Sequence, residues 1–429
     1  MDLDQFAALR TPAGASALAA AAELAGGDPL AAAAALRSAG VPGDLAAGAL
    51  TQAELRRRAV GKFGPVAARM FFTRAGLEQA TRSVVADRRA ARLRAAGVRS
   101  LADLGCGLGA DGLAAARAGI RVYGVEADPV TAAVAAANAE ATGLADRFTV
   151  EYGDATAFDV SRVDAAFCDP ARRGGTGRRV FDPAAYSPPW DFVTGLAARV
   201  PRTVVKVAPG IDHALIPTGA EAEWVSVAGD LVEAALWCGP LADRPRRATL
   251  LAATGGRVGP PAGHPPHTAS PARAPAPAGG PGSPPSGGHQ LTGDGTADAP
   301  VGPPGRFVYD PDGAVVRARL VAEFAATVEG RLADPSIAYV YADRYTSTPF
   351  GRCLEITDVL PFSLKRLRAL LRERGVGRVE ILKRGSALEP EKLRRDLRLS
   401  GPAPASLVLT RVAGAPTVLV GRPAEDPAG

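Results

Sequence analysis

Two kinds of hydrophobic pattern divide the first 250 residues of the chain. Up to residue 96, apolar positions recur at spacings of three and four, and Gly/Pro breaks interrupt them at 26–29 and 40–43. This spacing is typical of amphipathic helices, and the last helix is predicted to run from about Gly76 to Ala96. From Ser100 to Ala253, short apolar runs alternate with helical stretches. Such alternation predicts a parallel β-sheet covered by helices.

The end of this second region departs from the alternation. The apolar segments "EWVSVAGDLVEAALWCG" and "RRATLLAA" follow each other with no helical stretch between them. Strands joined without a helix pair in the antiparallel sense, so these segments predict a hairpin at the edge of the sheet.

The remaining chain divides into a spacer and a second folded part. Proline and glycine dominate residues 255–305, which cannot bury a core and are predicted to form a disordered linker. Strand and helix patterns return from residue 306 and close with the hairpin pattern "ASLVLTRVAGAPTVLVGRP". The predicted domains are a helical domain over 1–96, an α/β domain over 97–254, the linker over 255–305 and an α+β module over 306–429.

Charge is distributed unevenly along a chain of net charge +6. Basic residues outnumber acidic ones in 1–100 and 306–429, whereas acidic residues outnumber basic ones in 101–253. Basic flanks of this kind fit a polyanionic partner, but they are equally typical of solvent-exposed helices in an arginine-rich protein.

The four cysteines and the N-terminus indicate the cellular setting. Cys106, Cys168, Cys238 and Cys353 are widely spaced and form no CxxC pair, so neither a disulfide framework nor a metal site is expected. The N-terminus has acidic residues where a signal peptide needs basic ones, and no apolar run is long enough to span a membrane. We therefore expect a soluble cytoplasmic protein with no membrane partner.

The strongest motif joins the first predicted strand to the following helix. It reads Asp103-Leu-Gly105-Cys-Gly107-Leu-Gly109, and its glycines let a ligand approach the backbone at the start of a helix. The next strand ends at Glu126, where an acid can accept hydrogen bonds from ribose hydroxyls, and Asp154 follows the third strand, next to the place of an adenine edge. This order of residues resembles class I S-adenosylmethionine (SAM) methyltransferases. A nicotinamide-binding enzyme is the alternative, although its GxGxxG fingerprint is absent.

Two proline-containing motifs compete for the place of the catalytic loop, Asp169-Pro-Ala-Arg172 and Ser187-Pro-Pro-Trp190. Asp169-Pro170 directly follows the fourth predicted strand, and ligands of such sheets bind at the carboxyl ends of the strands. We therefore assign Asp169, Pro170 and Arg172 to the catalytic side. The assigned substrate contacts in this region are Arg173, Trp190, as a possible lid, and Lys206 on the fifth strand.

A cysteine mechanism is disfavoured by position. Cys168 precedes Asp169 and is expected to point into the sheet, and the loop after the fifth strand contains no cysteine. Direct in-line transfer to a nitrogen or oxygen remains, in which the protein mainly positions the nucleophile and accepts its proton.

The segments "FFTRAGLEQATRSVVADRRAARL", "DLGCGLGADGLA", "FCDPARR" and "KVAPGID" resemble a bacterial group of class I SAM-dependent methyltransferases whose members carry a C-terminal THUMP-like domain. The tail fits this resemblance through "LKRLRALLRERGVGRVEILKRG". The resemblance implies SAM contacts for Asp103, Gly105, Gly107, Glu126 and Asp154. It also implies an RNA substrate, tRNA or rRNA, with Lys365, Arg366 and Arg368 of the basic helix facing phosphates.

The leading hypothesis is a SAM-dependent methyltransferase that acts on a nitrogen of structured RNA. The chain has Asp-Pro-Ala where related RNA enzymes have Asp-Pro-Pro, which leaves the target atom open. A methyltransferase for a small molecule or a protein, and a non-catalytic SAM-binding or RNA-binding protein, remain as alternatives.

Overall fold

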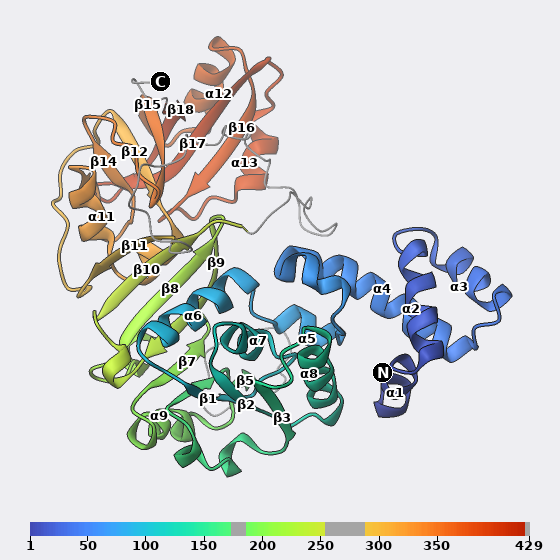
Figure 1. The fold of residues 1–429 in the computed structure, drawn as a ribbon. Helices are drawn as coiled ribbons and strands as arrows, with labels where there is room; N and C mark the ends of the chain where they lie inside the picture. Colours follow the sequence, from blue (N-terminus) through green and yellow to red (C-terminus); the bar gives the residue numbers. More distant parts are fainter. Residues whose placement is uncertain (173–185, 254–287, 425–429) are drawn as a thin grey trace, which may run out of the picture. The chain divides into compact units, whose positions relative to one another are not determined.

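The computed structural model describes residues 1–172, 186–253 and 288–424, which form two compact units (Figure 1). Unit 1 contains Met1–Ala220, Ala235–Asp243 and the described residues from Leu251. Unit 2 contains Glu221–Ala234, Arg244–Leu250 and the described residues from Gly288. Each unit is considered separately below.

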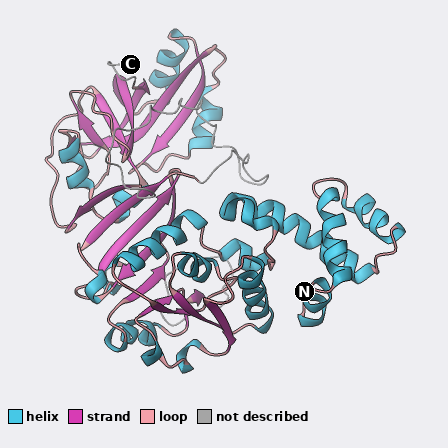
Figure 2. Cartoon of the chain, in the orientation of Figure 1, coloured by secondary structure: helices cyan, strands magenta, loops and turns pink. Residues whose placement is uncertain are grey.

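Unit 1 begins with helices, as the apolar spacing predicted (Figure 2). Several helices start with a side chain that accepts a hydrogen bond from a first-turn amide, for example Asp2, Thr11 and Asp28. The helices of unit 1 are α1 (Leu3–Leu9), α2 (Pro12–Leu24), α3 (Pro29–Ser38), α4 (Gly43–Phe63), α5 (Arg74–Gln79), α6 (Ser83–Ala95), α7 (Ala110–Arg117), α8 (Pro129–Ala141) and α9 (Trp190–Arg199).

The sheet of unit 1 has the strand order β9-β7-β4-β1-β2-β3. Its strands are β1 (Ser100–Leu104), β2 (Arg121–Glu126), β3 (Phe148–Tyr152), β4 (Ala165–Cys168), β7 (Thr203–Val207) and the end of β9 (Asp230–Trp237). From β3 to β7 the neighbours pair in parallel. The chain fills the sheet on one side of β1 and then crosses to β4 on its other side, so the switch point that opens a ligand site lies between β1 and β4.

The predicted helix from Gly76 to Ala96 is in fact two helices, α5 and α6, and this prediction was wrong. Between them Ala80 and Arg82 have extended backbones, with ψ of 137° at both residues. The ammonium of Lys62 donates hydrogen bonds to the carbonyl oxygens of Leu77, Glu78 and Ala80, at 2.7, 2.7 and 3.1 Å. These carbonyls are therefore satisfied from outside the helix, and the break brings residue 81 to the sheet.

The predicted boundary at residues 96/97 does not separate compact units. One hydrophobic core contains Phe6, Phe63 and Phe72 from the N-terminal helices together with Leu101 and Phe167 from the sheet. Because these side chains are buried against one another, α1 and the helices from α4 onward pack as part of the α/β body. A smaller apolar cluster, which includes Leu18, Leu36 and Ala49, holds α2, α3 and α4 together.

Unit 2 contains a β-hairpin and the C-terminal α+β module. Strands β8 (Glu221–Val227) and β9 are joined by Ala228 and Gly229, with φ of 52° and 87°. A two-residue loop with two positive φ angles makes a tight hairpin. Both of its strands come from the first of the two predicted segments, so the hairpin expected between the two segments is wrong in its partners. β8 pairs next with β10 (Arg246–Leu251), and β10 with β11 (His289–Gly293).

The predicted linker lies outside the described residues as far as 287, but the linker prediction is wrong for its end. Residues 289–293 form β11, whose backbone pairs antiparallel with β10 from Leu250↔His289 to Arg246↔Gly293. Composition missed this strand because its pairing partner lies about 40 residues earlier in the chain.

The C-terminal part of unit 2 is a seven-stranded sheet in the order β13-β14-β12-β15-β18-β17-β16. Its elements are β12 (Phe307–Pro311), α10 (Gly313–Arg317), α11 (Val321–Thr327), β13 (Arg331–Leu332), β14 (Val340–Ala342), β15 (Gly351–Pro361), α12 (Leu364–Glu373), β16 (Val376–Lys383), α13 (Pro390–Leu397), β17 (Ala403–Val412) and β18 (Ala415–Pro423). Leu367 and Leu371 of α12 and Leu393 of α13 are buried in one apolar cluster with Leu407 of the sheet. The other faces of both helices are thereby left to solvent. Within the described residues, no helix has the length and apolar character that a membrane crossing requires.

Candidate functional site

A cavity of about 800 Å³ opens in unit 1 at the carboxyl ends of the central strands. Of the six predicted cofactor residues, five line it, namely Asp103, Gly105, Gly107, Glu126 and Asp154. They meet there because β1 and β2 are adjacent parallel strands, whose ends lie at the same edge of the sheet. The sixth residue, Gly109, does not line the cavity.

The glycine loop after β1 has a backbone that side chains would not permit. Gly105, Gly107 and Gly109 have φ of 86°, 55° and 86°. A Cβ on Gly105 would lie 3.2 Å from the backbone oxygen of Asp169, and a Cβ on Gly109 would lie 2.7 Å from Cε1 of Phe148. Gly105 therefore allows the glycine loop to approach the backbone of Asp169 closely. Gly109 allows α7 to pack close to Phe148 of β3.

Asp103 ends in a buried position with an exposed fraction of 1%. Neither carboxyl oxygen makes a hydrogen bond of ordinary geometry within the described residues, although the Gly112 amide and Arg89 lie near enough to favour the ionised form. Burial, followed by the charges of Asp111 and Asp169, raises the pKa of Asp103 well above its usual range. The cavity thus contains a buried carboxyl group that favours its neutral form.

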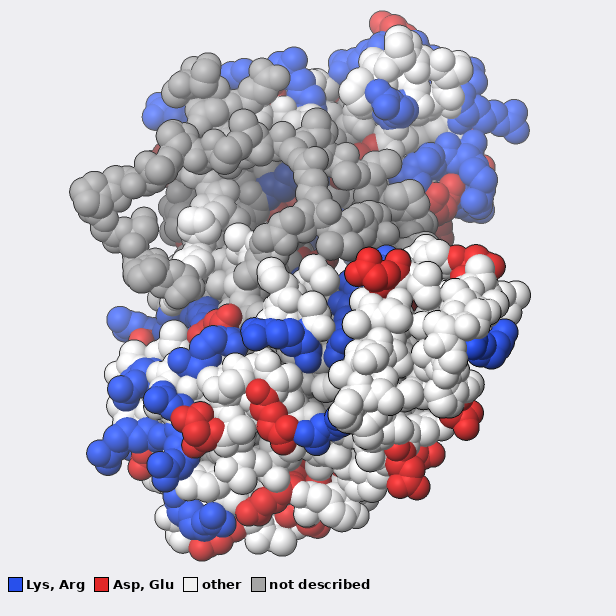
Figure 3. All heavy atoms as spheres, turned by 45° about the vertical axis from the view of Figure 1, so that its right-hand side comes forward, with Lys and Arg blue, Asp and Glu red and all other residues white. Residues whose placement is uncertain are grey.

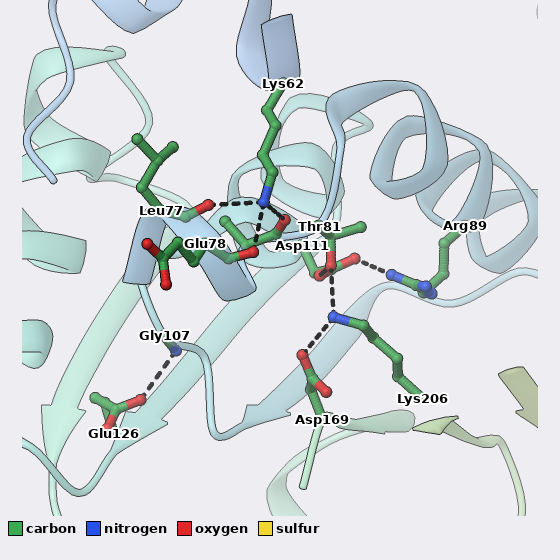
Figure 4. A network of polar contacts seen from close by, with 11 residues as sticks. Lys62, Leu77, Glu78, Thr81, Arg89, Gly107, Asp111, Glu126, Asp169 and Lys206 are labelled. Atoms are coloured by element: carbon green, nitrogen blue, oxygen red, sulfur yellow. Dashed lines mark hydrogen bonds and ion pairs between the residues drawn. The ribbon is translucent and has the colours of Figure 1, made fainter. Parts of the chain in front are cut away.

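Glu126 and Asp154 stand at the other side of the glycine loop. Glu126 Oε2 accepts a hydrogen bond from the Gly107 amide at 3.0 Å, and Oε1 accepts one from the Asp128 amide at 2.9 Å (Figure 4). Asp154 accepts from the Thr156 amide at 2.8 Å. Both side chains are held by local backbone amides, which fixes carboxylates at the ends of β2 and β3.

The opposite wall is a chain of polar contacts (Figure 4). Lys206 Nζ of β7 donates to Asp169 Oδ2 at 2.6 Å and to Thr81 Oγ1 at 3.2 Å. The Thr81 hydroxyl donates to Asp111 Oδ2 at 2.6 Å, and Arg89 forms an ion pair with the other oxygen of Asp111. The predicted catalytic Asp169 and the predicted substrate contact Lys206 therefore pair with each other.

The two proline motifs form parts of one structure. β5 (Ala171–Arg172) pairs antiparallel with β6 (Tyr186–Ser187), so Ala171 lies opposite Ser187. Asp169 and Pro170 line the cavity from the first motif, and Ser187 and Pro188 line it from the second. Because the two motifs are paired, both contribute residues to the cavity, although the sequence favoured only the first as the catalytic loop.

Several predicted target-side residues are not brought to the cavity. Trp190 is buried, with an exposed fraction of 8%, at the first turn of α9, and it does not line the cavity. Its assignment as a lid is wrong, because the indole is packed and not free to close over a ligand. Arg173 and the side chain of Arg172 lie outside the described residues.

Lys365, Arg366 and Arg368 belong to α12 of unit 2. Lys365 and Arg366 are exposed, as predicted for a helix face that meets solvent. Arg368 is half-buried and donates to the backbone oxygen of Asp396. One of the three predicted phosphate contacts is therefore used to join α12 to α13.

Sequence reasoning missed the part of the site that comes from the N-terminal helices. Thr73, Gly76, Gln79 and Thr81 line the cavity from α5 and the break that follows it. The segment "GLEQAT" belongs to the stretch that resembles the methyltransferase group. A single helix over 76–96, as predicted, does not indicate that Thr81 faces the sheet. Desolvation, followed by the charges of Lys206 and Arg82, lowers the pKa of nearby Lys62 to about 8.

The cysteines are placed as expected for residues without a catalytic role. Cys168 is fully buried in β4, and burial raises its pKa far above the usual range. Burial also raises the pKa of Cys238 to about 11. A thiol held neutral in this way is a poor nucleophile.

The residues around the cavity fit SAM. The volume is within the range of small-ligand sites, roughly 300–1,000 Å³. The glycine loop offers backbone without side chains, and Glu126 and Asp154 offer acceptors for a nucleoside. Asp103 contributes a buried carboxyl group whose oxygens make no hydrogen bond of ordinary geometry within the described residues, which leaves them as acceptors for a ligand that carries positive charge. SAM has such charge on its sulfonium and its amino group.

Known proteins resemble the chain over most of its length. A family model of a THUMP domain-like region matches residues 351–423, and a model of a domain of unknown function (DUF8688) matches residues 2–59. A protein of Mycobacterium tuberculosis, described as "Uncharacterized S-adenosylmethionine-dependent methyltransferase" in strains CDC 1551 and H37Rv, is 35% identical over 374 residues. That match covers 83% of this chain and 90% of the relative.

The fold has a counterpart among solved structures. The crystal structure of a "putative methyltransferase from Porphyromonas gingivalis W83" covers 90% of this chain and 92% of its own, with a TM-score of 0.66 and 21% identity. This likeness supports the Rossmann-like assignment of the sheet. Together with the mycobacterial relative and the THUMP-like match, it shows that the chain belongs to the SAM-dependent methyltransferases that carry a C-terminal THUMP-like domain.

Proposed function

We propose that this methyltransferase acts on a nitrogen atom of structured RNA, with Asp169 as the group that receives the target amine. The observation that carries the proposal is the setting of the Asp169 side chain. It lines the cavity beside the glycine loop and is about one-third exposed, at 34%. Among the described residues, Lys206 is its single hydrogen-bond donor, and it binds only Oδ2.

The residues of the site mainly position the cofactor and the target nitrogen, because the methyl donor is already reactive. When bound, SAM supplies a methyl group that is already activated on a positively charged sulfur. Asp169 can accept a hydrogen bond from an amine through Oδ1 and so direct the nitrogen lone pair toward the cavity. Pro170 is buried directly after it and restricts the backbone of the loop. Asp103, Glu126 and Asp154 would hold the cofactor on the other side.

Unit 2 supports RNA as the class of substrate. THUMP domains bind structured RNA, and residues 351–423 match a THUMP-like model. The helices α12 and α13 carry six exposed cations that have no ion-pair or hydrogen-bond partner within the described residues, namely Lys365, Arg366, Arg372, Lys392, Arg395 and Arg398. In Figure 3, Lys and Arg side chains gather on the upper right of the molecule, the region of these helices in Figure 1. Unpaired cations of this density favour a polyanion.

The test is nucleoside mass spectrometry of tRNA and rRNA from a strain that lacks the gene. We expect one methylated nucleoside to disappear, to return with the wild-type gene, and to remain absent with Asp169→Ala. If every methylated nucleoside persists in the deletion strain, the RNA proposal is wrong. A small-molecule or protein methyltransferase would then be the remaining enzymatic function.

A further inference from the structure

Thr81 occupies a position that its local sequence does not explain. It lies in the break between α5 and α6, it has an exposed fraction of 5%, and it lines the cavity. Through its hydroxyl group it touches both Lys206 and Asp111, which come from β7 and α7. This buried side chain thus connects the segment between α5 and α6 with β7 and α7, beside the predicted catalytic loop.

Only one assignment of hydrogen-bond donor and acceptor is consistent with the contacts of the Thr81 hydroxyl group. A hydroxyl group donates one hydrogen bond and accepts through its lone pairs. The Lys206 ammonium can only donate, so Thr81 accepts from it and must donate its own proton to Asp111. Arg89, whose side chain is 4% exposed, pairs with Asp111 and keeps it as the acceptor. The hydroxyl group is therefore oriented, and it holds the ammonium at a set place.

The ends of this chain are fixed by packing. The Arg89 guanidinium lies over the ring of Phe167 in β4, at 4.5 Å from its centroid. The backbone before Thr81 is held by Lys62, which binds the carbonyl oxygens of Leu77, Glu78 and Ala80. Neither end can shift without breaking buried contacts of the sheet or of α4.

The solvent exposure of the Lys206 and Asp169 side chains indicates different roles for the two residues. The Lys206 side chain is 15% exposed, whereas that of Asp169 is 34% exposed. Both side chains line the cavity, and Lys206 is the less accessible of the two to a target molecule. This arrangement suits a residue that acts through Asp169 better than the substrate contact expected from the sequence.

We propose that Lys206 and Thr81 are positioning residues of the methyl-transfer site, which hold Oδ2 of Asp169 so that Oδ1 faces the target. The proposal rests on the proposed role of Asp169. It makes the N-terminal helices part of the active site, since Lys62 of α4 fixes the segment that presents Thr81. The oriented hydroxyl group is the feature that distinguishes this role from simple packing.

The first experiment compares Thr81→Val with Thr81→Ser in the full-length protein. Valine keeps the shape and removes the hydroxyl group, whereas serine keeps the hydroxyl group. With tritiated SAM and total RNA from the deletion strain, we expect Thr81→Val to lower kcat about tenfold and Thr81→Ser to stay within about threefold of wild type. SAM affinity, measured by calorimetry, is expected to change less than threefold in both. Equal losses of kcat in the two variants would overturn the positioning role.

The second experiment needs no methyl acceptor. The chain has five lysines, so brief acetic anhydride labelling followed by peptide mass spectrometry resolves each of them. The neutral amine is the form that reacts, and Asp169 and Thr81 both favour the ammonium form of Lys206. We expect the labelling rate of Lys206 at pH 8 to rise at least threefold in Asp169→Asn and in Thr81→Val, with the exposed Lys365 and Lys392 unchanged.

The two experiments fail in distinguishable ways. If wild-type protein transfers no label to RNA while Lys206 responds as expected, the RNA proposal is wrong and the positioning of Lys206 is supported. An unchanged labelling rate of Lys206 in Thr81→Val, with the wild-type melting temperature retained, would show that Thr81 does not hold the ammonium. That result would overturn the inference whatever the acceptor.

Discussion

The ammonium of Lys206 lies 2.6 Å from Oδ2 of Asp169, and this pair joins two strands of the sheet at the mouth of the cavity. Asp169 follows β4 and Lys206 belongs to β7, which are adjacent parallel strands. Their side chains meet because Asp169 stands just beyond the paired end of β4, where the neighbouring strand also ends. The loop that begins at Asp169 is thereby tied to the sheet.

Replacing Asp169 is expected to affect transfer and not cofactor binding. Asp169→Asn keeps the size of the side chain and removes the charge that accepts from the target and from Lys206. We expect methyl transfer to fall by about 10²-fold, the scale of one acid–base group, while SAM affinity stays within about threefold. Single-turnover transfer and calorimetry measure the two effects. A variant with full transfer activity would remove Asp169 from the chemistry.

Glu126 is expected to control cofactor affinity. Its two oxygens are held by the amides of Gly107 and Asp128 at the rim of the cavity. Glu126→Gln should weaken SAM binding about tenfold, because charge-assisted acceptors are stronger than neutral ones. Glu151→Gln is the matched control, since Glu151 is exposed on β3 and does not line the cavity. Calorimetric affinities that fall equally in both variants would contradict the assignment of the ribose acid.

Asp103 makes the stability of the protein depend on pH in a defined sense. Its pKa in the folded state is raised by burial above the unfolded value, which is about 3.9. The folded state then holds a proton that the unfolded state has lost, so the contribution of Asp103 to stability falls as pH rises from about 4 through the folded pKa.

Asp103→Asn removes that dependence. We expect the variant to be more stable than wild type at pH 8, by about 1–3 kcal/mol, and the difference to shrink toward pH 4. Thermal melting of both proteins across this range measures the effect. A difference that is constant with pH would mean that Asp103 is not protonated in the folded protein. SAM binding is expected to weaken in the variant, since a carboxyl group that lines the cavity is lost.

Gly109 and Gly61 form a matched pair for the packing of the glycine loop. Gly109→Ala places a Cβ 2.7 Å from Phe148 at a φ of 86°, and should destabilise the protein by about 1–3 kcal/mol. Gly61 lies in α4 with open space around its Cβ position, so Gly61→Ala should stabilise by about 0.5–1 kcal/mol. Denaturant unfolding gives both values, and the opposite signs are the result to look for.

The exposed cations of α12 are expected to set the salt dependence of RNA binding. Each phosphate contact contributes about 0.7–0.9 to the slope of log K against log salt. Arg366→Ala should lower that slope by nearly one unit and weaken binding to total tRNA. Arg344→Ala is the control, because Arg344 is an exposed cation of unit 2 outside the two helices. Equal slopes for wild type and Arg366→Ala would show that this face does not meet phosphate.

Much of the cofactor side of the site could be predicted from the sequence. The glycine motif, Glu126 and Asp154 each follow directly from a strand, and parallel strands bring their ends to one edge. The same rule places Asp169 and Pro170 at this edge, where both line the cavity. Local pattern was sufficient in these cases because neighbouring elements in the sequence are also neighbours in the sheet.

Other features depended on contacts between distant parts of the chain. The break that brings Thr81 to the sheet is stabilised by Lys62, 19 positions earlier, which satisfies carbonyl groups that would otherwise continue the helix. β11 exists because β10 offers a paired edge, although its own composition resembles a linker. Trp190 was predicted to be a lid, and only its packing showed that it is buried.

The sequence by itself therefore determined the α/β order, the glycine loop and the identities of the acids that surround the cofactor cavity. The tertiary structure decided that the N-terminal helices share a core with the sheet, and that Asp169 is paired with Lys206 and backed by Thr81. The physical reason is the range of the interactions. Strand ends and tight turns are set by residues within a few positions, whereas buried hydrogen-bond chains join side chains that only the folded core brings within hydrogen-bond distance of each other.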